Sequence, residues 1–316
     1  MSKIQWTEQT WNPVTGCTKV SEGCAHCYAE GVANRFWGDR KFGDVQFHPE
    51  RLEQPLRRRK PTMYFVNSMS DLFHEDISFE VIAAILGIIA ITPHHTYQIL
   101  TKRPYRMLEF FSWLRFSDGD PWTECHFQAL QNDNEAEVIH KYDAKPTYEW
   151  PLPNLWLGVT CENQRTADER IPLLLQTPAA VRFLSCEPLL EAVDIDFENI
   201  AVGFVEDQMA TVGWDQSKYG MWEDFSPSEL LHWVIVGGES GAKARPCDIA
   251  WIRSIVEQCK EAEVPCFVKQ LGSKPVETVA TGLQWDWGAT KGKGGNPDEW
   301  PEDLRVREYP KALQPT

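Results

Sequence analysis

The chain has 316 residues and carries 31 basic against 46 acidic side chains, so its formal net charge at pH 7 is −15. This charge argues against a broadly basic nucleic-acid-binding surface, because neutralising phosphates needs clustered lysine and arginine. A hydrophobic fraction of 42% excludes a disordered chain. The chain has nine cysteines, an odd number, and its N-terminal residues do not resemble a signal segment, so we expect a cytoplasmic protein with reduced thiols.

Short β-branched or aromatic runs alternate with stretches of helical spacing along the chain. The predicted strands lie at residues 3–14, 63–71, 96–103, 155–163, 181–188, 232–240 and 265–272. The predicted helices lie at residues 24–37, 78–91, 104–114, 163–176 and 247–262, with Ser78 and Asn163 as expected N-caps. The strands are apolar almost throughout, which is typical of parallel strands covered on both faces. No apolar run reaches the ~20 residues that span a membrane, so we expect no membrane partner.

Polar residues end nearly every predicted strand. They are Asn67, Ser70, Asp71, Thr101, Lys102, Thr160, Glu162, Ser185, Glu187, Glu239, Ser240, Lys269 and Gln270. Strand ends that converge on one site are typical of a (β/α) barrel, whereas an open doubly wound sheet has its site at one switch point. We therefore predict an α/β fold, a partial (β/α)6-type TIM-like barrel over residues 1–272. Two peripheral insertions, at about 116–150 and 198–230, interrupt it, and residues 273–316 form a C-terminal surface extension.

Three of the nine cysteines lie within eleven residues, as Cys17-x6-Cys24-x2-Cys27, after the first predicted strand. Three thiolates in one loop can ligate a [4Fe–4S] cluster and leave its fourth iron open, or bind zinc with His26 or His48 as the fourth ligand. Disulfide pairing is the third alternative. The cysteine spacing does not separate these alternatives. The polar residues at the strand ends favour a cluster, because together with a cluster they would form a reaction chamber, whereas a structural zinc needs none.

The run GCTKVSEGCAHCYAE, residues 16–30, resembles the cluster loop of radical S-adenosylmethionine enzymes, in which an aromatic residue usually follows the last cysteine, as Tyr28 does here. The runs NSMSDLFHED and QILTKRP resemble motifs of the branch that contains spore photoproduct lyase. Over about residues 3–272 the chain also resembles a phage- and bacterium-encoded family of unknown activity, marked by WNPVTGC, CYAE, LGVTCEN, FLSCEPLL and VGGESG. The cysteine spacing of six then two departs from the usual three then two.

This resemblance implies an enzyme in which Cys17, Cys24 and Cys27 hold a [4Fe–4S] cluster and S-adenosylmethionine chelates the fourth iron. One-electron cleavage of the sulfonium then gives a 5′-deoxyadenosyl radical that abstracts a hydrogen atom from the substrate. Such an enzyme needs an external electron donor. By analogy with the nearest branch, the substrate is a nucleobase, free or in nucleic acid; no motif identifies it, and none indicates the oligomeric state.

The candidate cofactor contacts begin at the second and third predicted strands. We assign Asp71, with Asn67 and Ser70, to the methionyl amino group, since a carboxylate and two hydrogen-bond acceptors suit an ammonium. Lys102, beside Thr101, either pairs with the cofactor's carboxylate, as the resemblance suggests, or reaches solvent.

The next two strand ends supply further candidates. Glu162, after Thr160, suits the ribose hydroxyls of the cofactor. Ser185 and Glu187 flank Cys186, which is either a small buried hydrophobe or a catalytic hydrogen-atom donor.

The last strand ends carry a glycine-rich turn and two polar residues. Backbone N–H groups at Gly237 and Gly238 suit an adenine, a ribose or a phosphate, and Glu239 suits a hydroxyl or amine. Lys269 and Gln270 are candidates for contacting the substrate.

The densest basic run comprises Arg57, Arg58, Arg59 and Lys60, with Arg51 nearby. It is either a solvated helix end or a local contact for nucleic acid. Two alternatives to the radical enzyme also stay open. One is a zinc-binding barrel that acts as a hydrolase or nuclease, and the other is a non-catalytic binding module on the same fold.

Overall fold

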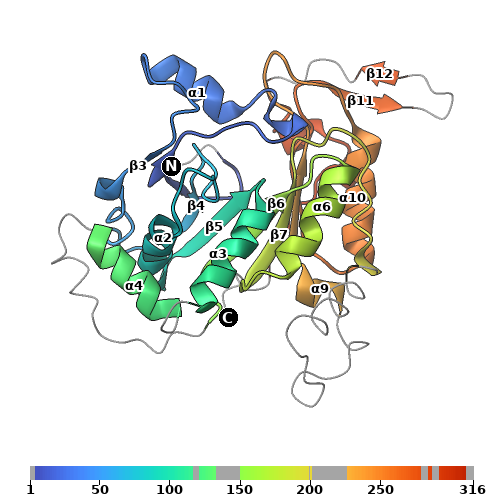
Figure 1. Cartoon of the computed structure of the whole chain (residues 1–316). Coiled ribbons are helices and arrows are strands. Elements are labelled where there is room, and N and C mark those ends of the chain that lie inside the picture. The colour runs from blue at the N-terminus through green and yellow to red at the C-terminus, as the bar shows by residue number, and fades with distance from the viewer. Residues whose placement is uncertain are drawn as a thin grey trace. The chain divides into compact units, whose positions relative to one another are not determined.

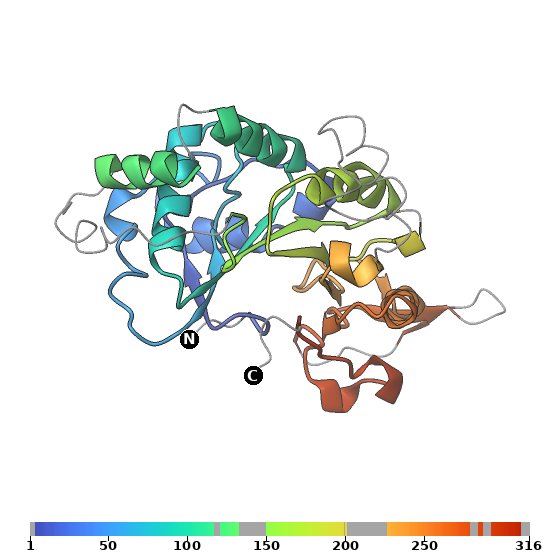
Figure 2. The same ribbon diagram turned by 90° about the horizontal axis from the view of Figure 1, so that it is seen from below.

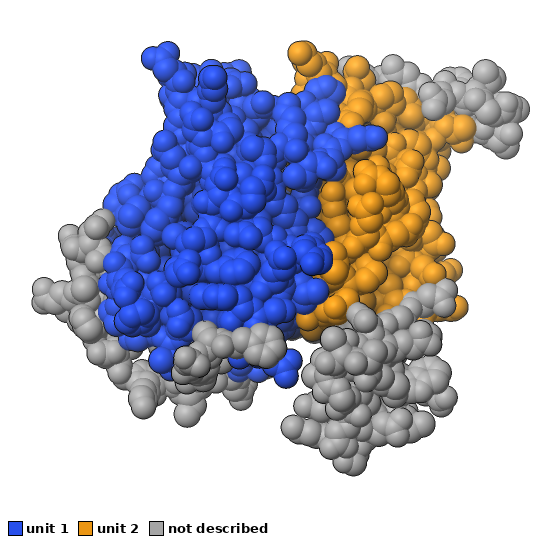
Figure 3. All heavy atoms as spheres, viewed as in Figure 1, with its two compact units in different colours: residues 1–158, 177–180 blue, residues 159–176, 181–316 orange. Residues whose placement is uncertain are grey.

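The computed structural model describes residues 4–116, 121–132, 150–198, 200, 226–278, 284–286 and 292–310. The ribbon is shown in Figure 1. Two compact units divide the chain (Figure 3): unit 1 comprises residues 1–158 and 177–180, and unit 2 comprises residues 159–176 and 181–316. Most of the two predicted insertions, 116–150 and 198–230, lies outside the described residues.

Seven strands form one sheet in the order β1-β4-β5-β6-β7-β8-β10. They are β1 (Gln9–Trp11), β4 (Met63–Val66), β5 (Thr96–Thr101), β6 (Leu155–Thr160), β7 (Val181–Cys186), β8 (Trp233–Gly237) and β10 (Cys266–Gln270). The described pairings β1–β4, β4–β5, β7–β8 and β8–β10 are all parallel. Every residue of β6 and β8 is buried, as expected for apolar strands covered on both faces. The predicted α/β fold with a parallel sheet is confirmed.

The helices of unit 1 are α1 (Tyr28–Phe36), α2 (Phe79–Ile91), α3 (Pro104–Phe116) and α4 (Pro121–Asn132). Every residue of α2 from Ile82 to Ile91 is buried, and Ser78 caps the helix by accepting from the Val81 N–H. Helix α4, which lies inside a predicted insertion, packs against α2, as Figures 1 and 2 show. The covering of α2 by α4 explains why α2 has no polar face.

The helices of unit 2 are α6 (Gln164–Leu175), α9 (Pro227–Leu230) and α10 (Ile249–Glu261). Asn163 caps α6 as predicted, in a reciprocal capping box with Thr166. Helix α10 buries one face, formed by Ile249, Ile252, Ile255 and Cys259, and lies along β8 and β10 (Figures 1 and 2).

Shorter strands complete the two units. In unit 1, β2 (Val14–Thr15) pairs antiparallel with β3 (Gln46–Phe47). In unit 2, β9 (Cys247–Asp248), β11 (Pro275–Thr278) and β12 (Gln284–Asp286) form a three-stranded sheet.

The segment predicted as a C-terminal surface extension follows the edge of β10. Trp300 and Leu304 are buried, and the Val268 N–H donates to the Val306 carbonyl at 2.9 Å. Residues from 292 to 310 therefore contribute packing to unit 2. None of the helices in the described part of the chain is long and apolar enough to cross a membrane.

Two predicted elements have different bounds in the structure. The strand predicted over residues 3–14 is interrupted at Pro13, which has no N–H to donate to a ladder, so β1 ends at Trp11. The helix predicted over residues 24–37 begins only at Tyr28, because a 3-10 turn, Glu22–Cys24, precedes it.

Candidate functional site

The cysteine loop, residues 17–27, begins where Gly16 turns the chain out of β2. Gly16 has a φ of 96°, a left-handed conformation that glycine adopts without strain. Its N–H donates to the Met69 carbonyl at 3.0 Å, and the Cys17 N–H donates to the Phe42 carbonyl at 2.9 Å. The first bond fixes the start of the loop against the segment after β4, and the second fixes it against the segment between α1 and β3.

The three cysteines of this loop differ from the other six. Cys17, Cys24 and Cys27 are partly exposed, whereas the remaining cysteines are buried, and none of the nine forms a disulfide bond. Burial, with the nearby Asp71 carboxylate, raises the pKa of Cys17 to about 11, although the Arg103 guanidinium opposes this rise. Within the described ranges, no group of three or more His, Cys, Asp or Glu side chains is arranged to hold a metal ion.

Arg103, which follows β5, connects the cysteine loop to the sheet and was not among the predicted site residues. Its guanidinium donates to the carbonyl and hydroxyl oxygens of Thr18 at 3.1 and 2.8 Å, and to the Cys17 sulfur at 3.5 Å. It also pairs with Asp71 at 3.3 Å and with Glu75 at 3.2 Å. An arginine directly after a strand that ends in Thr-Lys was the only sequence signal for this role.

Asp71 connects the segments that follow β4 and β5 by hydrogen bonds. Its Oδ1 accepts from the Thr101 hydroxyl at 2.7 Å and from the Phe73 N–H at 3.1 Å. Its Oδ2 accepts from the Lys102 N–H at 3.0 Å and from Arg103 at 3.3 Å. Because an ionised carboxylate offers about four lone-pair sites, these four donors satisfy it, and a cofactor ammonium would have to displace one of them.

Asn67 and Ser70 hold β2 in place. The Asn67 Oδ1 accepts from the Val14 N–H at 3.2 Å, and the Ser70 hydroxyl donates to the Val14 carbonyl at 2.9 Å. The Asn67 side-chain nitrogen is buried and has no hydrogen-bond partner among the described residues. Its free polar atom is thus a donor, which does not suit the predicted contact with an ammonium. The Ser70 oxygen keeps its acceptor capacity.

His74 is a second residue that the sequence analysis did not name. The Asp76 N–H donates to its Nδ1 at 3.1 Å, so the ring proton lies on Nε2 and donates to the Thr18 hydroxyl oxygen at 2.8 Å. Burial, with the charge of Arg103, lowers the pKa of His74 and keeps the ring neutral. His74 and Arg103 therefore hold the same threonine of the cysteine loop.

The basic run precedes β4, whereas Asn67, Ser70 and Asp71 follow it. The run therefore lies at the opposite end of this strand from the cysteine loop. Arg57 pairs with Glu53 at 2.7 Å, and Arg58 donates to the Thr62 hydroxyl at 2.6 Å.

Two predicted carboxylates of unit 2 are held by arginines. Glu162 is fully buried and pairs with Arg170 at 2.8 Å. Glu239 accepts from the Arg245 guanidinium with both oxygens, at 3.0 and 2.8 Å. Their predicted roles in binding a cofactor stay predictions, since a ligand would compete with these pairs.

Glu187, Lys269 and Gln270 come together at the ends of β7 and β10. The Lys269 ammonium contacts both oxygens of Glu187 at 2.7 Å, and the Gln270 amide donates to Glu187 at 3.1 Å. The same amide donates to the Gly238 carbonyl at 2.9 Å. A Cβ at Gly238 would collide with the Leu271 carbonyl, so backbone packing alone requires glycine there.

The remaining predicted residues of unit 2 are buried. Thr160 and Ser185 are at most 2% exposed, and Cys186 is 0% exposed. Burial raises the pKa of Cys186 well above its usual value, and Cys161 and Cys266 lie close by. This environment matches the small buried hydrophobe of the sequence analysis, and the hydrogen-atom donor stays a prediction.

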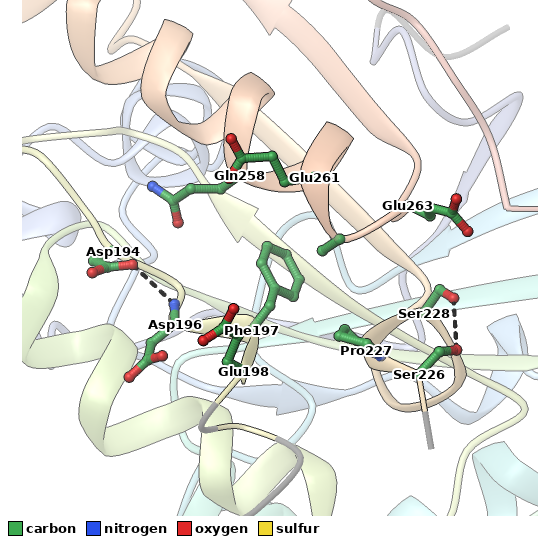
Figure 4. A pocket seen from close by; sticks show the side chains of 11 residues that line it. Asp194, Asp196, Phe197, Glu198, Ser226, Pro227, Ser228, Gln258, Glu261 and Glu263 are labelled. Carbon is green, nitrogen blue, oxygen red and sulfur yellow. Dashed lines mark hydrogen bonds between the residues drawn. The ribbon is translucent and has the colours of Figure 1, made fainter. Parts of the chain in front are cut away.

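An acidic cavity of about 470 Å³ lies elsewhere in unit 2 (Figure 4). Asp194, Asp196, Glu198, Glu261 and Glu263 line it, with Phe197 among them. The lining includes Glu198 and Ser226, which lie on either side of a stretch outside the described residues. An acidic cluster alone identifies no ligand. We assign no function to this cavity.

Comparison with known proteins gives one match. No curated protein and no solved structure matches the chain. A family model described as a protein of unknown function, DUF5131, matches residues 1–294. Because this match covers far more than half of the 316 residues, the chain belongs to the DUF5131 family.

Proposed function

We propose that the protein is a cytoplasmic radical S-adenosylmethionine enzyme on a partial (β/α)6-type barrel. In this proposal Cys17, Cys24 and Cys27 hold a [4Fe–4S] cluster. The observation that carries it is the distribution of the thiols, because six of the nine cysteines are buried and the three exceptions share one loop. Cysteines that only fill a core are buried, whereas thiols that ligate metal have to be reachable.

By residue type, the donor set of the loop suits an iron–sulfur cluster, although the three thiols are not arranged around a metal ion in the described part of the chain. Three thiolates are the ligands that such clusters use, and the Arg103 guanidinium, 3.5 Å from the Cys17 sulfur, offsets part of their negative charge. When bound, the cluster supplies one electron for cleaving the sulfonium of S-adenosylmethionine, which generates a hydrogen-abstracting radical. For the zinc alternative, one of the two predicted fourth ligands, His48, has its Nε2 already 2.7 Å from the Thr15 hydroxyl, which leaves His26 as the candidate.

Residues around the loop have separate tasks in this proposal. Lys102, whose backbone is fixed by Asp71, binds the carboxylate of S-adenosylmethionine, since its ammonium has no ion-pair partner in the described part of the chain. Ser70 accepts from the amino group, because its oxygen is the remaining acceptor of the predicted set. Asp71 and Arg103 position these residues and the loop.

The other participants rest on the resemblance. An external donor supplies the electron, and the substrate is a nucleobase, by analogy with the branch that contains spore photoproduct lyase. The basic run is not part of this proposal, since it lies at the opposite end of β4 and two of its arginines are already paired within unit 1.

Anaerobic purification tests the proposal. The wild-type protein is expected to be brown, to contain about 4 iron atoms per chain, and to form 5′-deoxyadenosine from S-adenosylmethionine and dithionite. The variant Cys24→Ala should lose both properties. The matched control Cys125→Ala removes a buried thiol of the same unit and should keep both.

Two outcomes would contradict the proposal. A colourless protein with one zinc per chain would support the zinc-binding barrel. Iron bound without formation of 5′-deoxyadenosine would support a non-catalytic binding module.

A further inference from the structure

The stretch KGKGG, residues 291–295, belongs to the predicted C-terminal extension. In the structure, its described part returns to the end of β10 beside Lys269 and Glu187. We infer that Lys293, Lys269 and the turn 292–295 bind the phosphate group of a nucleotide. Phosphate binding itself is independent of the proposed function, while the choice of a nucleotide rests on it.

The turn is built as a fixed backbone surface. Gly292 and Gly294 have left-handed φ angles of 75° and 63°. The Gly294 carbonyl accepts from the Leu271 N–H at 3.0 Å and from the Trp300 indole at 3.0 Å, and the Gly292 carbonyl accepts from the Ser273 hydroxyl at 2.8 Å. Turns that contain left-handed residues can present successive N–H groups, and such concavities bind anions.

The charges at this place favour an anion. Lys269, Lys293 and Arg307 are three cations, and Glu187 is the carboxylate that faces them. Lys269 is paired with Glu187, whereas the Lys293 ammonium has no hydrogen-bond or ion-pair partner among the residues that the structure describes. Burial, together with the charge of Lys269, lowers the pKa of Lys293. Lys293 shares its nearest carboxylate, Glu187, with Lys269, so a bound anion would add the charge that this group of cations lacks, and a phosphate carries up to two charges.

Arg307 supports the site from behind. Its guanidinium lies 5.3 and 5.2 Å from the ring centres of Phe267 and Trp300. It donates to the carbonyls of Val268 and Lys269, both at 3.3 Å. Arg307 therefore fixes the end of β10 and adds positive potential, and Lys293 and Lys269 remain for direct contact.

This assignment moves the phosphate contact away from the Gly237-Gly238 turn. The structure explains Gly238 by its packing against Leu271, so its lack of a side chain needs no ligand. The turn 292–295 combines left-handed glycines with an unpaired lysine, which the first turn does not have. A nucleotide held by its phosphate would be a substrate larger than a free base.

Isothermal titration tests the inference on anaerobically purified full-length protein without reductant. The probes are the four deoxynucleoside 5′-monophosphates and the matching nucleosides, which differ only in the phosphate. A short single-stranded oligonucleotide is the third probe and distinguishes a backbone phosphate from that of a free nucleotide. We expect a monophosphate or the oligonucleotide to bind about tenfold or more tightly than the nucleosides, the factor that one charge-assisted hydrogen bond produces.

The variants locate the contact. Lys293→Ala should remove this preference, Lys293→Arg should retain most of it, and the exposed control Lys260→Ala should leave it unchanged. Near-UV circular dichroism confirms that each variant is folded. Equal binding of monophosphate and nucleoside by the wild type, or an unchanged preference in Lys293→Ala, would overturn the inference.

Iron is counted in the same samples, so the two proposals fail separately. Phosphate binding by a protein without iron would leave this site intact and remove the radical chemistry. An iron-loaded protein that forms 5′-deoxyadenosine but shows no preference for a phosphate would support the radical chemistry and overturn the phosphate site.

Discussion

Replacement of Arg103 by alanine is expected to release the cysteine loop from the end of β5. In the wild type, the guanidinium holds Thr18 with two hydrogen bonds, at 3.1 and 2.8 Å, and pairs with Asp71 at 3.3 Å. Alanine removes all three contacts and also the donor to the Cys17 sulfur. The loop keeps, among other contacts, its backbone bond to Phe42, the contact of Thr18 with His74 and the ion pair of Lys19 with Glu30.

The burial of the pair sets the size of the effect. The side chains of Arg103 and Asp71 are each 8% exposed, and removing one partner of a buried ion pair costs about 3–5 kcal/mol. The lower end applies, because Asp71 keeps three other donors. The contact with Glu75, which is 63% exposed, contributes less than about 1 kcal/mol. We therefore expect the free energy of unfolding to fall by about 3 kcal/mol.

Urea unfolding followed by tryptophan fluorescence measures this loss. The matched control is Arg165→Ala, which breaks the exposed pair with Glu169 and should cost less than about 1 kcal/mol. Iron retained after anaerobic gel filtration should also fall in Arg103→Ala and not in the control. If Arg103→Ala unfolds within about 1 kcal/mol of the wild type, the guanidinium does not hold the loop and the reasoning is refuted.

Three further predictions concern other parts of the two units. Arg170→Met removes the partner of the buried Glu162 and should lower the free energy of unfolding in urea by about 3–5 kcal/mol. Adding Glu162→Gln should restore part of this stability. A double variant as unstable as the single one would contradict the pairing. Burial lowers the pKa of His232 from 6.5 to about 4, so the unfolded chain takes up a proton that the folded chain does not between these values. Stability should therefore be complete above pH 6.5 and fall by up to about 3 kcal/mol toward pH 4, and His232→Gln should flatten this part of the measured profile; a parallel profile would show that His232 does not titrate this way. Arg57→Glu combined with Arg58→Glu should leave nucleotide affinity in titration unchanged, and an about tenfold loss would place the ligand at the basic run instead.

Local signals in the sequence account for the parts of the fold that were predicted correctly. The helix from Phe79 to Ile91 follows from its apolar run and from Ser78, which lies three residues before its bonding partner Val81. Asn163 caps α6 through Thr166, again three residues away. Continuous apolar runs such as β6 and β8 identified the parallel sheet, because each run itself shows that both of its faces are buried.

The partners inside the candidate site were not predictable in the same way. Arg103 contacts Thr18, 85 residues earlier, and Asp71, 32 residues earlier, and no local pattern connects residues so far apart. Asp71 was identified as a functional carboxylate, but its occupation by four donors depends on how β4 and β5 end. The approach of residues 292–295 to β10 likewise depends on tertiary packing.

The central claim is that the three partly exposed thiols, Cys17, Cys24 and Cys27, hold an iron–sulfur cluster that cleaves S-adenosylmethionine. Its most direct test is the amount of 5′-deoxyadenosine formed per chain by anaerobic wild-type protein, Cys24→Ala and Cys125→Ala, with iron counted in each sample. The account predicts about 4 iron atoms and 5′-deoxyadenosine in the wild type and in Cys125→Ala, and loss of both in Cys24→Ala. Equal amounts of product from Cys24→Ala and wild type, or no product from an iron-loaded wild type, would contradict it.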